Sequence, residues 1–162
     1  MRPYQQETPN MLWNWNKKTF KHTLASQGAR TAKEIIELLN EVVLQNTDKV
    51  IEELADVAIM LWALAAGSNI DARPHLPKDV VLENATLLEI VTRLNVTYAL
   101  YLRHFHSQSH DAGKQLIKTL INLELVAKLL QVDLPEIVDR KMGVNRGRNW
   151  EELSPGNYQH VA

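Results

Sequence analysis

The feature that most constrains this fold is a long apolar segment, residues 50–67, with acidic side chains in its first two turns. As a helix, its apolar side chains would point in nearly every direction, which is typical of a helix buried on all sides. Glu53 and Asp56 share one face of that helix and point into the apolar surroundings. An unpartnered buried carboxylate is costly or becomes protonated. The segment therefore requires a cation, either a metal ion or a basic side chain, unless the helix dipole alone favours these acids.

Composition sets the class of protein. The chain has 162 residues, 45% of them hydrophobic, and a formal net charge of −1. This balance favours one globular domain and argues against a nucleic-acid-binding protein. The chain contains no cysteine, which excludes a disulfide framework and fits a reducing compartment. We find no secretory signal, and the charge-free run 57–70 is too short to span a bilayer. We therefore expect a cytoplasmic protein that binds neither nucleic acid nor a membrane.

Helical periodicity predicts an all-α bundle of five to six helices in a single domain, residues 1–162. An irregular N-terminal arm (1–12) and a C-terminal tail (151–162) flank the helices. The only strand candidate, KDVVLEN (78–84), is short. The expected helices are 13 or 14 to 26, 31–44 with Thr31 as its cap, 47–66, 83–106, 111–130 and one that begins at Asp133.

A second acidic stripe lies on the expected helix 31–44. Glu34, Glu37 and Glu41 fall on one face, which by itself fits a solvated surface. The short break before residue 47 predicts that this helix packs antiparallel to the apolar one, so that the pair Glu34 and Glu37 could meet the pair Glu53 and Asp56. Four carboxylates without sulfur or imidazole suit Mg²⁺ or Mn²⁺. Ion pairing with basic residues elsewhere is the alternative.

The C-terminal segment DLPEIVDRKMGVNRGRNW (133–150) carries a second polar pattern. Lys141, Asn145 and Arg148 recur at spacings of four and three, so a continuous helix would place them on one face. Gly143 and Gly147 each cost a helix about 1 kcal/mol relative to alanine, which leaves open whether the basic residues lie on a helix or a loop. A cationic helix end favoured by the macrodipole is the simpler interpretation.

Together the two patterns resemble a known family. AKEIIELLNEV and IEELADVAIML match the E-x-x-E…E-x-x-D signature, and KMGVNRGRNW matches the K-x-x-x-N-x-x-R tail, of the all-α NTP pyrophosphohydrolases. These form the MazG-like and dimeric dUTPase-like superfamily. The resemblance covers roughly residues 31–150. It implies a MazG-like bundle completed by oligomerisation, as a homodimer or homotetramer, and Mg²⁺ or Mn²⁺ held by Glu34, Glu37, Glu53 and Asp56.

The resemblance also implies a reaction, hydrolysis of a (deoxy)nucleoside triphosphate to the monophosphate and pyrophosphate. Relatives act on dUTP, on several NTPs, or on purine dNTPs such as dGTP and dATP, and the motifs do not separate these. Glu37, Glu41 or Glu52 would accept the proton of the attacking water. The expected substrate-binding residues are Lys141, Asn145 and Arg148 for the phosphates and Trp15 and Asn16 for the base.

Two alternatives remain open from the sequence. The first is a phosphoribosyl-ATP pyrophosphohydrolase, which makes the same cleavage but is disfavoured by the extra helices and the aromatic N-terminal segment. The second is a non-enzymatic helical interaction module whose acids are paired with the C-terminal arginines.

Overall fold

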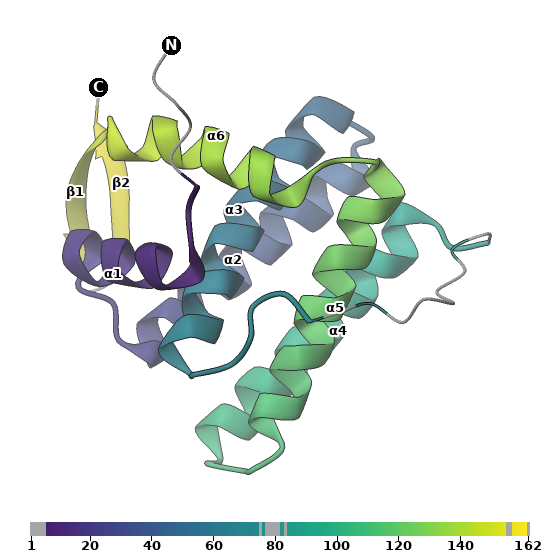
Figure 1. The fold of residues 1–162 in the computed structure, drawn as a ribbon, viewed down its shortest axis with the longest axis horizontal. Coiled ribbons are helices and arrows are strands. Elements are labelled where there is room, and N and C mark those ends of the chain that lie inside the picture. Colours follow the sequence, from purple (N-terminus) through teal and green to yellow (C-terminus); the bar gives the residue numbers. More distant parts are fainter. Residues whose placement is uncertain (1–5, 75, 77–81, 83, 155–156, 162) are drawn as a thin grey trace.

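The computed structural model describes residues 6–74, 76, 82, 84–154 and 157–161, and these form six helices and one two-stranded sheet (Figure 1). Most of the described residues are helical and the single sheet is small, so the predicted all-α bundle is confirmed. The elements are, in order, α1 (Pro9–Phe20), α2 (Leu24–Val43), α3 (Thr47–Gly67), α4 (Leu87–His106), α5 (Ala112–Leu130), α6 (Leu134–Arg146), β1 (Asn149–Ser154) and β2 (Asn157–Val161).

Helix α3 lies at the centre of the bundle, as its apolar sequence predicts. Helices α1, α2 and α6 pack against it, and α4 and α5 form a long pair on the other side of α2 and α3 (Figure 1). Leu54, Leu61 and Leu64 of α3 are fully buried, and Trp62 is nearly so. Because α3 is surrounded by other helices from Leu54 to Ala65, a polar side chain in that part of it must face a cavity or a charged partner.

The start of α2 differs from the prediction. Thr31 does not cap the helix. Thr23 does, in a capping box with Ser26, and the Thr31 hydroxyl donates to the carbonyl of Gln27 at 2.7 Å inside the helix. Gly28, in the gap between the two predicted helices, lies within α2, where its carbonyl accepts a hydrogen bond from the Tyr98 hydroxyl. A Cβ there would lie 3.3 Å from Leu102, so close packing of α4 explains this glycine.

The N-terminal segment also differs from the predicted irregular arm. Helix α1 begins at Pro9 and is capped by Thr8, and proline is well tolerated in the first turn of a helix. Residues 9–12 are therefore helical. It ends at Phe20, before the predicted residue 26, because Lys21 takes a left-handed conformation with φ of 55°. The prediction missed this boundary because Lys21 lacks the usual glycine signal.

The C-terminal tail, for which no strand or helix was predicted, contains regular structure in its described residues. Strands β1 and β2 pair antiparallel with Trp150 opposite His160 and Glu152 opposite Tyr158. This hairpin stands beside α1, between it and the end of α6 (Figure 1), and Phe20 packs at 4.9 Å from Trp150 and 5.1 Å from Tyr158 between ring centroids. Contact with α1 stabilises strands too short to be predicted from alternation.

The remaining boundaries follow the predictions closely. Helix α3 begins at Thr47 after an Asn46 cap, and α6 begins after Asp133, whose side chain accepts from the Glu136 amide. Helix α4 starts at Leu87, four residues later than expected. The strand candidate KDVVLEN lies largely outside the described residues.

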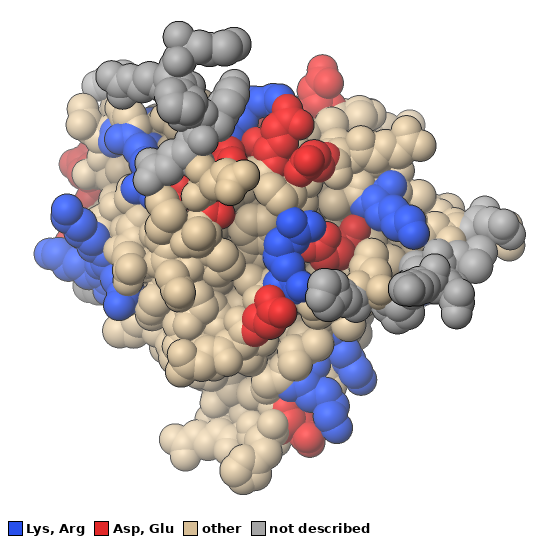
Figure 2. Space-filling model, viewed as in Figure 1, with Lys and Arg blue, Asp and Glu red and all other residues tan. Residues whose placement is uncertain are grey.

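Two surface properties complete the fold. None of the described helices is both long and apolar enough to cross a membrane. On the face shown in Figure 2, lysine and arginine side chains are interspersed with acidic ones.

Candidate functional site

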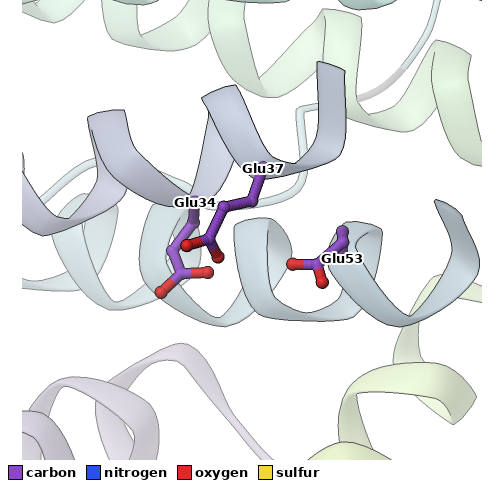
Figure 3. Close-up of side chains that lie close together, drawn as sticks. All are labelled: Glu34, Glu37 and Glu53. Carbon is purple, nitrogen blue, oxygen red and sulfur yellow. The ribbon is translucent and has the colours of Figure 1, made fainter. Parts of the chain in front are cut away.

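The α2–α3 hairpin brings three glutamates together. Glu34 and Glu37 extend from α2 toward Glu53 of α3 (Figure 3), and one carboxylate oxygen from each lies within 4.8 Å of the other two. Glu34 is buried, with 5% of its surface exposed, and the other two are half-buried. The two acidic faces therefore converge as the spacing predicts.

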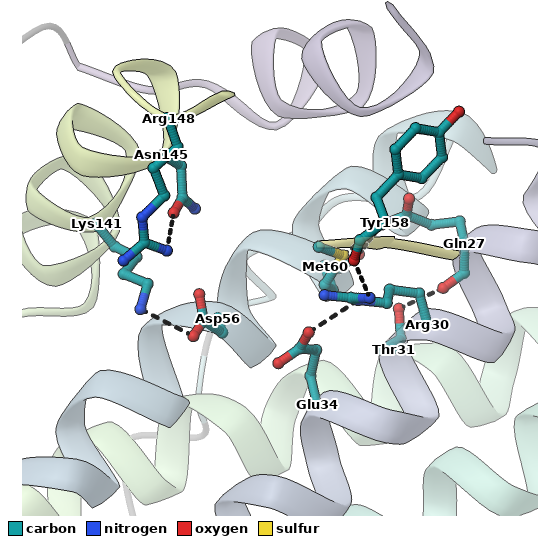
Figure 4. Close-up of polar contacts among 10 residues, drawn as sticks. All are labelled: Gln27, Arg30, Thr31, Glu34, Asp56, Met60, Lys141, Asn145, Arg148 and Tyr158. Atoms are coloured by element: carbon teal, nitrogen blue, oxygen red, sulfur yellow. Dashed lines mark hydrogen bonds and ion pairs between the residues drawn. The ribbon is translucent and has the colours of Figure 1, made fainter. Parts of the chain in front are cut away.

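Asp56, the fourth predicted metal ligand, has a basic partner. Its Oδ2 lies 3.1 Å from Nζ of Lys141, a residue of α6 that the sequence assigns to phosphate binding (Figure 4). Asp56 follows Glu53 by one helical turn, and its charge also acts on Glu34 and Glu53. The ion pair thus joins the acidic site to the basic helix α6.

Glu34 has a partner that the sequence analysis did not select. Nε of Arg30 lies 3.0 Å from Glu34 Oε1, one turn earlier on α2. The same guanidinium donates through Nη1 to the carbonyl of Tyr158 at 3.4 Å, which connects α2 to strand β2 (Figure 4). The R-x-x-x-E spacing of 30 and 34 was the available signal.

The carboxylates perturb one another strongly. Burial, followed by the charges of Asp56 and Glu37, raises the pKa of Glu53 to about 7. Burial and Asp56 also raise the pKa of Glu34, although Arg30 opposes the shift. Burial raises the pKa of Asp56 against the opposing effect of Lys141. Arg30 and Lys141 therefore leave part of the negative charge uncompensated, and a further cation would relieve it.

A cavity of about 400 Å³ opens onto these groups. Its acidic wall contains Glu34, Glu37, Glu53 and Asp56. Asn145 and Arg148 line it from the region that follows Lys141. Its aromatic wall comes from α1 and the hairpin: Trp15, Phe20, Trp150, Tyr158 and His160. The cavity thus combines oxygen donors, cations and flat apolar rings.

The predicted phosphate-binding residues share one end of α6. Helix α6 continues through Gly143 and ends at Arg146, so Lys141 and Asn145 are helical and Arg148 follows the helix. Arg148 Nη1 lies 3.5 Å from the Asn145 side-chain oxygen, and the Trp150 indole donates to the Asn145 carbonyl at 3.3 Å. Of these three residues, Arg148 alone lies beyond the helix, after Gly147, whereas Gly143 does not interrupt it.

Four predicted site residues are not among those that line this cavity. Lys141 lines a neighbouring groove between α3 and α6 instead, and its ion pair with Asp56 connects it to the acidic wall. Glu52 is exposed, forms an ion pair with Lys49 at 3.1 Å, and lines the same groove. Glu41 lies one turn beyond Glu37 and is not among the cavity-lining residues. Asn16 is buried and donates to the Leu12 carbonyl at 2.8 Å, which gives it a structural contact.

The contributions of the hairpin and of Arg30 were not predicted from the sequence. Trp150, Tyr158 and His160 were not selected because no strand was predicted near the C-terminal tail, and the available signal was their aromatic character.

No family model, curated protein or solved structure matches the chain. The site is therefore interpreted from its own geometry, together with the motif spacing.

Proposed function

We propose that the protein is a metal-dependent nucleoside triphosphate diphosphatase, similar in activity to the MazG-like pyrophosphohydrolases. One observation carries the proposal: a cavity lined on one side by converging glutamates and on another by the Asn145–Arg148 end of α6. Acidic and basic groups in one cavity suit a substrate that is itself an anion bound with a cation. The proposed setting is the cytoplasm.

The donor set fits a hard divalent cation. Glu34, Glu37 and Glu53 offer carboxylate oxygens within 4.8 Å of one another, and burial, followed by the charges of Asp56 and Glu37, raises the pKa of Glu53. Asp56 would join them by exchanging Lys141 for the ion. Bound Mg²⁺ or Mn²⁺ would supply positive charge for the phosphates and acidify a water molecule.

The other polar groups would orient the phosphates and accept the proton of the attacking water. Lys141, Asn145 and Arg148 would orient the β and γ phosphates and stabilise charge as the bond from the α phosphorus to its bridging oxygen breaks. Water adds to the α phosphorus, pyrophosphate leaves, and a carboxylate takes the water proton. Glu37 is the first candidate for this base because it lines the cavity, whereas Glu41 and Glu52 do not.

The aromatic wall supports a nucleotide as substrate. Trp15 of α1 and the rings of the hairpin offer flat apolar surfaces for a base. We include a purine dNTP, such as dGTP or dATP, among the proposed substrates. The proposal includes assembly as a homodimer or homotetramer.

The test is product identification. Purified protein with Mg²⁺ or Mn²⁺ is incubated with each common NTP and dNTP, and the products are separated by anion-exchange chromatography. We expect monophosphate and pyrophosphate in equal amounts from at least one substrate, and less than about a tenth as much from a Glu53→Gln variant. Glu136→Gln, which changes an exposed glutamate on α6, is the matched control. Diphosphate and inorganic phosphate as the products, or full activity of Glu53→Gln, would contradict the proposal.

One observation favours a second candidate, a non-enzymatic interaction module. Two of the four carboxylates already have basic partners, Glu34 with Arg30 and Asp56 with Lys141. If these pairs are purely structural, calorimetric titration with Mn²⁺ should show no binding that depends on Glu37 and Glu53. The enzyme proposal requires that binding.

A further inference from the structure

Arg30 occupies an unusual position for a helix-surface arginine. Its side chain is 20% exposed, and its partner Glu34 is more deeply buried. It forms its two contacts with different elements, the Glu34 carboxylate on α2 and the Tyr158 carbonyl on β2. In Figure 4 the guanidinium lies between these partners, on the side of the acidic site opposite Lys141 and Arg148. The hairpin thus holds the cation beside a proposed metal ligand.

The guanidinium retains capacity for another ligand. It carries five N–H donors in a planar fork, and Nε and Nη1 make the two contacts just described. Arg30 also lines the cavity of about 400 Å³ that holds the glutamates. A planar guanidinium at the wall of a cavity is suited to a phosphate group.

Charge explains why the contact with Glu34 can change. Glu34, Glu37, Glu53 and Asp56 lie close enough to perturb one another, and in the ion-free protein Arg30 offsets part of their charge. A divalent cation on the glutamates would replace that function and repel the guanidinium. The Tyr158 carbonyl would still hold Arg30 near the cavity. A cation released from Glu34 in this way is available to an anion.

We propose that Arg30 is a phosphate-binding residue that exchanges partners: it neutralises Glu34 in the ion-free protein and donates to a substrate phosphate when a divalent cation occupies the glutamates. The inference rests on the proposed function and extends it. The substrate would be held from two sides, by Arg30 of α2 on one side and by Lys141 of α6 and Arg148, which follows that helix, on the other.

The proposal makes two predictions of opposite sign for Arg30→Met, both measured by isothermal titration calorimetry. Without an anion, the variant should bind Mn²⁺ about threefold more tightly, because a competing positive charge is removed. With saturating Mg²⁺, it should bind pyrophosphate about tenfold more weakly, because a charge-assisted contact is lost. Arg140→Met is the matched control, since Arg140 also pairs four residues away along a helix, with Glu136 at 2.7 Å, but in solvent. The control should change neither affinity.

The outcomes separate this inference from the proposed function. Unchanged or weaker Mn²⁺ binding by Arg30→Met, or unchanged pyrophosphate binding, overturns the role of Arg30 alone when the wild-type protein binds both ligands. A wild-type protein that binds neither ligand overturns both proposals.

Arg30→Lys keeps the test decisive if the methionine variant does not fold. Lysine retains the charge but not the fork, so Mn²⁺ affinity should stay within about twofold of wild type while pyrophosphate binding weakens about threefold. Wild-type pyrophosphate affinity in this variant would overturn the proposed phosphate contact.

Discussion

Glu53 is the residue at which stability and ligand binding oppose each other most directly. Burial and the neighbouring charges of Asp56 and Glu37 raise its pKa from 4.5 to about 7. The folded protein therefore holds a proton that the unfolded chain releases near pH 4.5. The resulting stabilisation is complete below that pH and is lost as the pH rises through 7. At neutral pH and above, the carboxylate is ready for a cation at a cost to the ion-free fold.

Replacement of Glu53 by glutamine should separate these effects. Near about pH 8 without metal, we expect Glu53→Gln to be about 1 kcal/mol more stable than wild type, allowing for solvent screening of the half-buried group, because glutamine does not ionise. The gain should shrink toward about pH 5. Urea unfolding at both pH values measures it. An equal difference in stability between the variant and wild type at both pH values would show that burial and the neighbouring carboxylates do not raise the pKa of Glu53. The same variant should lose more than about nine-tenths of any hydrolytic activity.

At the residue scale, the sequence predicted the acidic cluster but not its counter-charges. The positions of Glu34, Glu37 and Glu53 follow from helical periodicity and a short loop, which are local properties. The pairing of Asp56 with Lys141 depends on the packing of α6 against α3, between residues far apart in the chain. Helical periodicity does not show which helices pack against each other. The basic residues of the C-terminal segment could therefore be named as candidate site residues, but the carboxylates that they pair with could not.

At the scale of elements, local sequence signals predicted α3 well, whereas the two ends of the chain depend on tertiary contacts and were predicted poorly. The apolar residues of α3 and the flanking caps predicted its extent to within a residue or two. The hairpin of β1 and β2 could not be predicted, because its strands are short and pack through Trp150 and Tyr158 on the Phe20 ring of α1. Its aromatic wall therefore enters the site only through tertiary structure.

The packing of α1 on α3 can be tested with a pair of glycines. A Cβ at Gly67, the last residue of α3, would lie 2.7 Å from the rigid Trp13 ring, whereas a Cβ at Gly143 in α6 meets nothing within 4 Å. Gly67→Ala should destabilise the protein by about 1–3 kcal/mol because the ring must shift. Gly143→Ala should stabilise it by up to about 1 kcal/mol through helix propensity. Chemical unfolding of both variants measures the difference. A neutral or stabilising Gly67→Ala would mean that α1 is not held against α3 as described.

At the scale of the whole molecule, the site joins most of the fold. Its residues come from α1, α2, α3, the end of α6 and the hairpin. A ligand that binds across these elements should stabilise the folded state as a unit. We expect millimolar Mn²⁺ to raise the melting temperature measured by calorimetry, and EDTA to reverse the increase. The Glu53→Gln variant should show a smaller increase. An unchanged melting temperature in wild type would mean that Arg30 and Lys141 are the permanent partners of the carboxylates.

The surface of α2 and α4 bears on assembly. These helices pack against each other, and both expose large apolar side chains that a monomer would leave in water: Ile36, Val43, Leu88, Val96 and Leu100. Apolar groups repeated on adjacent helices favour association with a second copy through a two-fold axis. The proposed homodimer should therefore use this surface, defined here as the α2–α4 surface.

A charge placed on the α2–α4 surface should prevent that association. Val96 is 52% exposed, so Val96→Glu costs little in a monomer but places a charge in the proposed interface. We expect wild-type protein at about 100 μM to have a dimeric or tetrameric mass by light scattering, and Val96→Glu to have a smaller one. Leu153→Glu is the matched control, because Leu153 is 54% exposed but lies on β1. It should leave the mass unchanged. A monomeric wild type would contradict assembly, whereas a mass altered only by Leu153→Glu would place the interface on the hairpin.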